Sequence, residues 1–70
     1  MSNPHQYVDV LVPLPLPKLL TYSLEGVEEE VIEGMRAVVQ VGARKMYTGL
    51  IWNLHNDAPT AYAARPIETL

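Results

Sequence analysis

Seventy residues with eight acidic and five basic side chains give a formal net charge of −3, and no cysteine is present. This length allows one small domain, which excludes a self-contained enzyme of ordinary size, and the charge does not favour a strongly basic nucleic-acid binder. The lack of cysteine excludes a disulfide framework and a thiolate zinc site, while 49% apolar and only 19% charged residues argue against a disordered chain.

The N-terminal region predicts a loose start followed by a strand. Residues 1–6 (MSNPHQ) are polar and carry neither the basic nor the apolar region of a secretion signal. From Tyr7 to Val12 apolar residues alternate, with Val8, Val10 and Val12 on one face, which is typical of a half-buried strand. We therefore expect a loose N-terminus over 1–6 and a single domain over 7–70.

A proline-rich segment follows this strand, with proline at positions 13, 15 and 17. Proline fixes φ and lacks a backbone donor, so a helix or a central strand is excluded and an extended edge segment is expected, with Leu14 and Leu16 available for packing. The P-x-P-x-P spacing differs from the P-x-x-P of SH3 ligands. The run is too short to span a bilayer, so no membrane association is expected and a cytoplasmic location is the default.

Residues 19–34 combine a second short strand, Leu19–Leu24 (LLTYSL), with an acidic segment. The segment from Gly26 to Gly34 (GVEEEVIEG) allows either one helical turn or a solvated connection between its two glycines. Five of the eight acids lie between residues 25 and 33, and the remaining residues carry five basic against three acidic side chains, or +2. The chain is therefore mildly basic outside this segment.

The second half predicts a β-hairpin and a terminal loop. Residues 36–41 alternate with Ala37, Val39 and Val41 on the inner face, residues 42–45 form a turn, and residues 46–54 form the longest strand. In that strand Met46, Leu50, Trp52 and Leu54 share the expected inner face, so Trp52 is expected in the core. Residues 53–60 are loop, and residues 61–70 are expected to end in a short strand through Ile67. These elements predict a mainly β, partly closed antiparallel barrel-like domain, with at most one short helical turn.

The sequence lacks the common catalytic motifs. It contains no phosphate loop, no G-x-G-x-x-G motif and no serine in a nucleophile elbow, so we expect no enzymatic activity and no cofactor in this chain. His55 and Asp57 form a His-x-Asp pair without a third ligand nearby, and a surface histidine is the preferred interpretation. No metal site is therefore predicted.

Three stretches in order carry a resemblance to a known family: Val10–Tyr22 (VLVPLPLPKLLTY), Gly34–Gly42 (GMRAVVQVG) and Arg44–Ile51 (RKMYTGLI). Together they resemble the N-terminal domain of the bacterial primosomal protein N′, the PriA replication-restart helicase family. The resemblance implies a module that recognises the 3′ end of the nascent leading strand at stalled forks, cut from a longer α/β helicase. The ATP-dependent helicase lobes and the zinc module would lie in the absent parts. DNA with a free 3′ end at forked structures, the remaining helicase domains and primosome proteins are the partners this implies.

The resemblance also implies site residues. The family's pocket for the terminal nucleotide maps to Leu20, Thr21, Tyr22, Gly42 and Arg65, and Lys18, Arg44 and Lys45 are candidate phosphate contacts. Thr21 stands where the family often has aspartate, Leu20 replaces an aromatic residue, and Gln40-Val41 stands where Pro-Phe is usual. Tyr22 is equally consistent with a core residue, and Gly42 with a glycine that supplies positive φ to a turn. The alternatives are an SH3-like protein-interaction module and a structural fragment that dimerises through its sheet edges.

Overall fold

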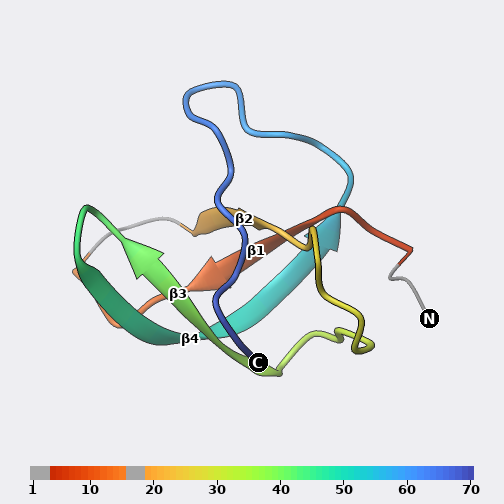
Figure 1. Ribbon diagram of the computed structural model, residues 1–70, viewed down its shortest axis with the longest axis horizontal. Helices are drawn as coiled ribbons and strands as arrows, with labels where there is room; N and C mark the ends of the chain where they lie inside the picture. The colour runs from red at the N-terminus through yellow and green to blue at the C-terminus, as the bar shows by residue number, and fades with distance from the viewer. Residues whose placement is uncertain (1–3, 16–18) are drawn as a thin grey trace.

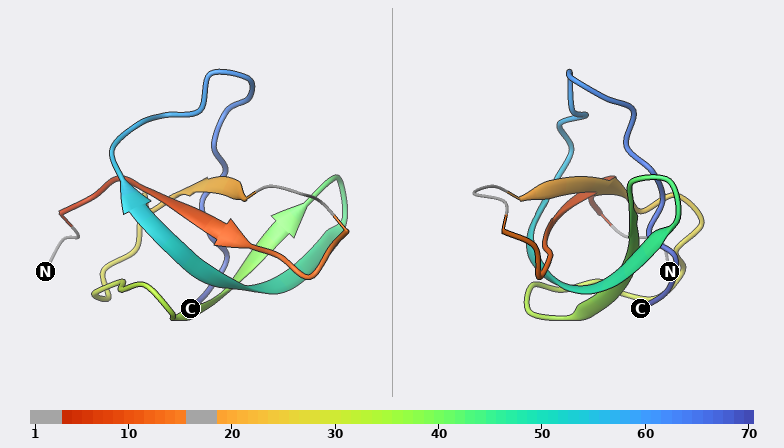
Figure 2. Two further views of the ribbon diagram at one scale, coloured as in Figure 1. Left: turned by 180° about the vertical axis from the view of Figure 1, so that it is seen from behind. Right: turned by 90° about the vertical axis from the view of Figure 1, so that its left-hand side faces the viewer.

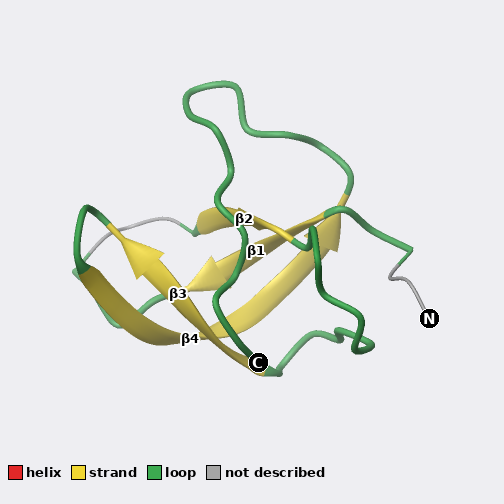
Figure 3. Cartoon of the chain, viewed as in Figure 1, coloured by secondary structure: helices red, strands yellow, loops and turns green. Residues whose placement is uncertain are grey.

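In the computed structural model, which describes residues 4–15 and 19–70, four strands form one antiparallel sheet (Figures 1 and 3). Its spatial order is β2-β1-β4-β3. The strands are β1 (Tyr7–Leu11), β2 (Leu20–Ser23), β3 (Arg36–Val41) and β4 (Lys45–His55). The sheet curls on itself as a half-barrel, seen end-on in the right-hand view of Figure 2. The predicted mainly β, barrel-like fold and the β3–β4 hairpin are confirmed.

The core lies inside this curl and follows the period of two in the sequence. Val8 and Val10 of β1 and Val39 of β3 are fully buried, and Val12 is 6% exposed. Because successive side chains of a strand point to opposite faces, these valines all meet on the concave side. The expected inner faces of β1 and β3 are thus confirmed.

The expected inner face of β4 is wrong at Met46, Leu50 and Trp52, whereas Leu54 packs against the core as expected. Leu50, Met46 and Trp52 are 40%, 50% and 53% exposed, whereas Gly49 and Ile51 are buried. The physical reason is the close approach of β4 to β1: a Cβ atom at Gly49 would lie 2.5 Å from Val10 Cγ1 and 2.8 Å from the carbonyl oxygen of Leu11. The face that contacts β1 so closely needs a glycine, and the larger residues lie on the convex side.

The connections correct one expectation and answer one question that the sequence left open. Residues 13–15 bend, and the Leu14 N–H donates to the Val12 carbonyl at 2.8 Å, so this part is not a straight extended segment. Leu16 and Lys18 lie outside the described residues. Residues 25–34 form a connection without a helical turn, with Gly26 and Gly34 at positive φ. Its glutamates are exposed and Val31 is buried.

The C-terminal segment closes the open side of the half-barrel. Two isolated bridges replace the expected short strand: Ser23 with Pro66 in parallel, and Val38 with Thr69 in antiparallel orientation. The N–H groups of Ser23 and Val38 donate to the carbonyls of Arg65 and Thr69, each at 2.7 Å. Ile67 between them is buried. Residues 65–69, which we call the closing segment, therefore join the edge strands β2 and β3. No helix in the described part of the chain is long and apolar enough to cross a membrane.

Candidate functional site

A pocket of about 680 Å³ lies where β2 and the end of β3 separate and the chain leading into the closing segment passes over them. Three separated stretches of sequence line it: Leu20, Thr21, Tyr22, Gln40, Val41, Gly42, Tyr62, Ala63, Ala64, Arg65 and Pro66. All five residues that the resemblance assigned to a terminal-nucleotide pocket are among them. The structure thus brings together residues that are up to 45 positions apart in the chain, from Leu20 to Arg65.

Tyr22 forms a buried wall of the pocket. Its side chain is 4% exposed, and its hydroxyl donates to the Gln40 carbonyl at 2.8 Å, which ties β2 to β3. Burial raises the pKa of this phenol although the charge of Arg65 acts in the opposite direction, so the hydroxyl remains a donor at neutral pH. Tyr22 is therefore a core residue that also lines the pocket.

Gly42 and Arg65 form the rim. Gly42 has φ of +73°, a conformation that glycine adopts without a steric cost, and a Cβ atom there would meet nothing within 4 Å. Its carbonyl accepts a hydrogen bond of 2.6 Å from Arg65 Nη1. The side-chain amide of Gln40 donates to the neighbouring carbonyl of Ala43 at 2.9 Å. The turn is therefore braced from both sides, and one cation is fixed at the mouth of the pocket.

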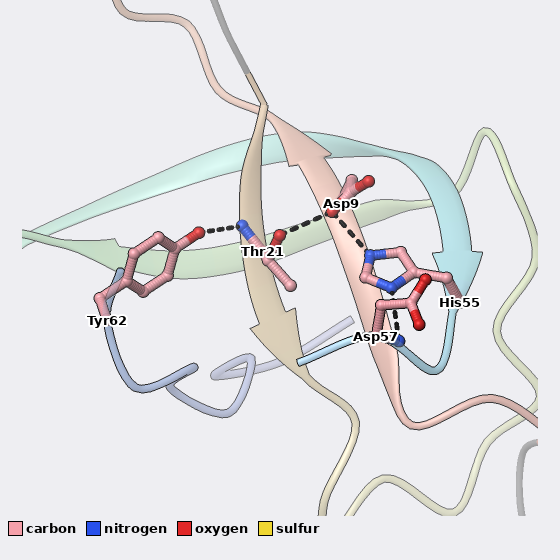
Figure 4. Close-up of polar contacts among 5 residues, drawn as sticks. All are labelled: Asp9, Thr21, His55, Asp57 and Tyr62. Carbon is pink, nitrogen blue, oxygen red and sulfur yellow. Dashed lines mark hydrogen bonds and ion pairs between the residues drawn. The ribbon is translucent and has the colours of Figure 1, made fainter. Parts of the chain in front are cut away.

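Thr21 connects the pocket to a polar network on the convex face of the sheet (Figure 4). Its N–H donates to the Tyr62 hydroxyl at 2.9 Å, and its hydroxyl donates to Asp9 Oδ1 at 2.7 Å. His55 Nε2 contacts the same carboxylate oxygen at 2.8 Å. Because the Asp57 N–H donates to His55 Nδ1 at 3.1 Å, Nε2 is the nitrogen that carries the proton and donates to Asp9.

Asp9 is the centre of this network. Burial by itself would raise the pKa of its carboxyl group, but the hydrogen bonds from His55 and Thr21 outweigh burial and lower the pKa below its usual value of 3.8. His55 is held further by stacking against Tyr7, with ring centroids 6.2 Å apart. The expected surface histidine is thus a partly buried partner of a carboxylate.

Other predicted groups lie outside the pocket lining. Arg44 in the β3–β4 turn and Lys45 at the start of β4 are exposed, two and three positions after Gly42, and Lys18 lies outside the described residues. Asp57 contacts His55 through its backbone rather than its carboxylate. Among the described residues there is no group of three or more His, Cys, Asp or Glu side chains that could hold a metal ion.

Sequence reasoning missed Tyr62, Asp9 and His55 as parts of this arrangement. Asp9 and Thr21 are direct partners in the β1–β2 register, and Tyr7 is the partner of His55 in the β1–β4 register. The alternation of β1 places Asp9 on the outward face, but only the register shows which side chains it meets. Nothing in the sequence around Tyr62 marks it, because its partner is 41 positions away.

Comparison with family models gives a match over residues 9–70 to the PriA family described as the 3′DNA-binding domain (3′BD). The chain belongs to this family. Its function is therefore that of a DNA-binding domain of PriA, a binding module rather than a catalytic one. No curated protein and no solved structure matches the chain.

Proposed function

We propose that this PriA 3′ DNA-binding domain holds the 3′-terminal nucleotide of a DNA strand in the pocket between β2, the β3–β4 turn and the chain leading into the closing segment. The single observation that carries the proposal is the convergence of Leu20, Thr21, Tyr22, Gly42 and Arg65 around one pocket. A cavity with a mainly apolar lining and a few convergent polar groups is the usual form of a small-ligand site.

The chemistry of the rim fits a nucleotide. The exposed backbone at Gly42 allows close approach of a sugar or phosphate, because no Cβ atom stands in the way. The guanidinium of Arg65, held by the Gly42 carbonyl, supplies a cation for the last phosphodiester. These contacts would read the strand end and its backbone rather than a base sequence.

Thr21 supplies the acceptor for a free 3′-hydroxyl. Its own hydroxyl proton is donated to Asp9, so its oxygen has only lone pairs left to offer to a ligand. A terminal 3′-hydroxyl donates into such an acceptor, whereas a terminal 3′-phosphate brings negative charge toward Asp9. In this arrangement Asp9 acts through Thr21 in place of the carboxylate that the family often carries at that position.

The wider role follows from the family to which the domain belongs. We infer a place in replication restart, at the 3′ end of the nascent leading strand at stalled forks, within a cytoplasmic ATP-dependent helicase that assembles a primosome. ATP and zinc would be bound by other parts of that protein. What supports this role is the family assignment over residues 9–70.

The test compares single strands that end in a 3′-hydroxyl with the same strands ending in a 3′-phosphate, by fluorescence anisotropy at fixed salt. We expect the hydroxyl-ended strand to bind about tenfold more tightly, the value of one hydrogen bond of about 1.4 kcal/mol. Thr21→Val should abolish most of this difference, and Thr48→Val on the exposed face of β4 is the matched control. Equal, weak and salt-sensitive binding to both strands would leave only a basic patch and reject the pocket.

A further inference from the structure

Tyr62 is an aromatic residue of the pocket wall whose ring is still accessible. Its side chain is 46% exposed, against 4% for Tyr22, which lines the same pocket. The hydroxyl of Tyr22 is occupied by the Gln40 carbonyl and its ring packs in the core, so it offers a ligand far less surface than Tyr62 does. The remaining lining around Tyr62 is mainly small and aliphatic, including Ala63, Ala64 and Val41.

The ring of Tyr62 is held at its far end. Its hydroxyl accepts the N–H of Thr21 at 2.9 Å, and Figure 4 shows the ring reaching from its loop to the edge of β2. That N–H belongs to the edge strand β2, which pairs with β1 alone among the four described strands. Three residues later the loop is fixed by Arg65, whose carbonyl accepts the Ser23 N–H at 2.7 Å and whose guanidinium donates to Gly42. A ring fixed by its tip and its backbone loses little further freedom when a flat ligand packs on it.

We propose that Tyr62 is the stacking residue for the 3′-terminal base, a role that rests on the proposed function of the pocket. Every nucleobase has a π face, so stacking on tyrosine favours a base without selecting its identity. The phenol oxygen is anchored to β2 and leaves the faces of the ring as the accessible surface. The terminal base thus packs on Tyr62, while Thr21 and Arg65 contact the sugar and phosphate of the same nucleotide.

The experiment measures binding of the 70-residue chain to 3′-hydroxyl single strands that end in a normal nucleotide or in an abasic one. Tyr62→Ala should weaken binding to the normal strand by at least about fivefold, the lower end for loss of one base–aromatic stack. The wild-type chain should bind the abasic-ended strand about as weakly as Tyr62→Ala binds the normal one, and the variant should lose nothing further on it. Tyr62→Phe, which keeps the ring without its anchor, should retain most of the affinity.

Trp52→Ala is the matched control, because Trp52 is 53% exposed but lies on β4 outside the pocket. A strand with 2-aminopurine as its 3′-terminal base gives a second readout: its fluorescence should be quenched by the wild-type chain and by Tyr62→Phe, and not by Tyr62→Ala. Unchanged affinity of Tyr62→Ala, or an equal loss on the abasic-ended strand, would overturn the stacking role. If Tyr62→Ala does not fold, the aminopurine signal with Tyr62→Phe and with the wild-type chain decides, and no quenching in either rejects the inference.

The two proposals fail separately. The chain could still discriminate between 3′-hydroxyl and 3′-phosphate while its affinity was unaffected by Tyr62→Ala or by removal of the terminal base. That result would overturn the stacking role and leave the proposed pocket standing. Conversely, the chain could fail to discriminate while Tyr62→Ala weakened binding only to strands that have a terminal base. That result would overturn recognition of the 3′-hydroxyl and support stacking of the base on Tyr62.

Discussion

At the scale of single residues, Asp9 couples three strands through one carboxylate. It lies on β1, accepts from Thr21 on β2 and accepts from His55 at the end of β4. Such a carboxylate stabilises the fold only while it is ionised, because protonation removes an acceptor that both donors share. The pKa of Asp9 is lowered because the folded state favours the ionised carboxylate, and the ionised carboxylate in turn favours the folded state.

This coupling predicts an acid-sensitive contribution to stability. Because the pKa of Asp9 is lower in the folded chain than in the unfolded one, its contribution is fully present above the unfolded value near 3.8 and is lost as pH falls through the folded value. Asp9→Asn should reduce the free energy of unfolding by about 1 kcal/mol near pH 6. The difference from the wild-type chain should shrink as the pH falls below the unfolded value near 3.8, as measured by urea unfolding at each pH.

Asp57→Asn is the matched control for that measurement, since Asp57 contributes only its backbone N–H to His55. It should leave stability near pH 6 within about 0.5 kcal/mol of the wild-type value. A constant difference between Asp9→Asn and the wild-type chain across the whole pH range would contradict the role of the ionised carboxylate.

At the scale of elements, the close approach of β4 to β1 depends on one glycine. Gly49→Ala would place a Cβ atom 2.8 Å from the Leu11 carbonyl oxygen, a backbone atom that cannot move aside without shifting β1. We expect a loss of about 1–3 kcal/mol in the free energy of unfolding, typical of overpacking. Thr48→Ala, one residue earlier and exposed, should cost much less. If Gly49→Ala and Thr48→Ala had equal midpoints of thermal unfolding, the close contact between β1 and β4 at Gly49 would contribute nothing to stability.

The same contact explains how far the sequence could predict the elements. The alternation of apolar and polar residues correctly predicted β1, β3 and the hairpin, because one face of β1 and of β3 carries most of the apolar residues. It failed in β4, where Leu50 and Trp52 on the convex face outweigh Gly49 and Ile51 in size. The register of β4 against β1 also skips Trp52, since Asp9 pairs with Asn53 and Val10 with Ile51. A bulge of this kind depends on the partner strand and leaves no signal in a single strand's pattern.

The residues of the candidate site also fall into those that the sequence predicted and those that it did not. Leu20, Thr21, Tyr22, Gly42 and Arg65 were predicted from a resemblance of local motifs, and they line one pocket. Tyr62 and Asp9 were not predicted, because their partners follow from pairings between distant segments. The burial of Tyr22 was one of two interpretations open from the sequence, and the structure adds the hydrogen bond from its hydroxyl to the end of β3.

At the scale of the whole molecule, the net charge of −3 is unevenly placed. The acidic connection of residues 25–34 lies at the opposite end of the sheet from the β3–β4 turn in both Figure 1 and Figure 2. The molecule extends 33 Å along its longest axis, whereas salt at physiological strength screens charges beyond about 8 Å. DNA held near Gly42 and Arg65 should therefore experience the local cations more strongly than the distant acids.

Neutralising the acidic connection tests this separation of charge. Replacing the exposed Glu28, Glu29, Glu30 and Glu33 by glutamine changes the net charge from −3 to +1, because four negative charges are removed. If DNA binds at the pocket, the affinity for a 3′-hydroxyl strand near 150 mM salt should change by less than about twofold. Arg65→Ala should instead weaken binding and reduce the slope of log affinity against log salt by about 0.7, the value for one phosphate contact on a single strand. A tenfold gain in the four-glutamine variant, with no change of slope in Arg65→Ala, would place the DNA against the acidic end and away from the pocket.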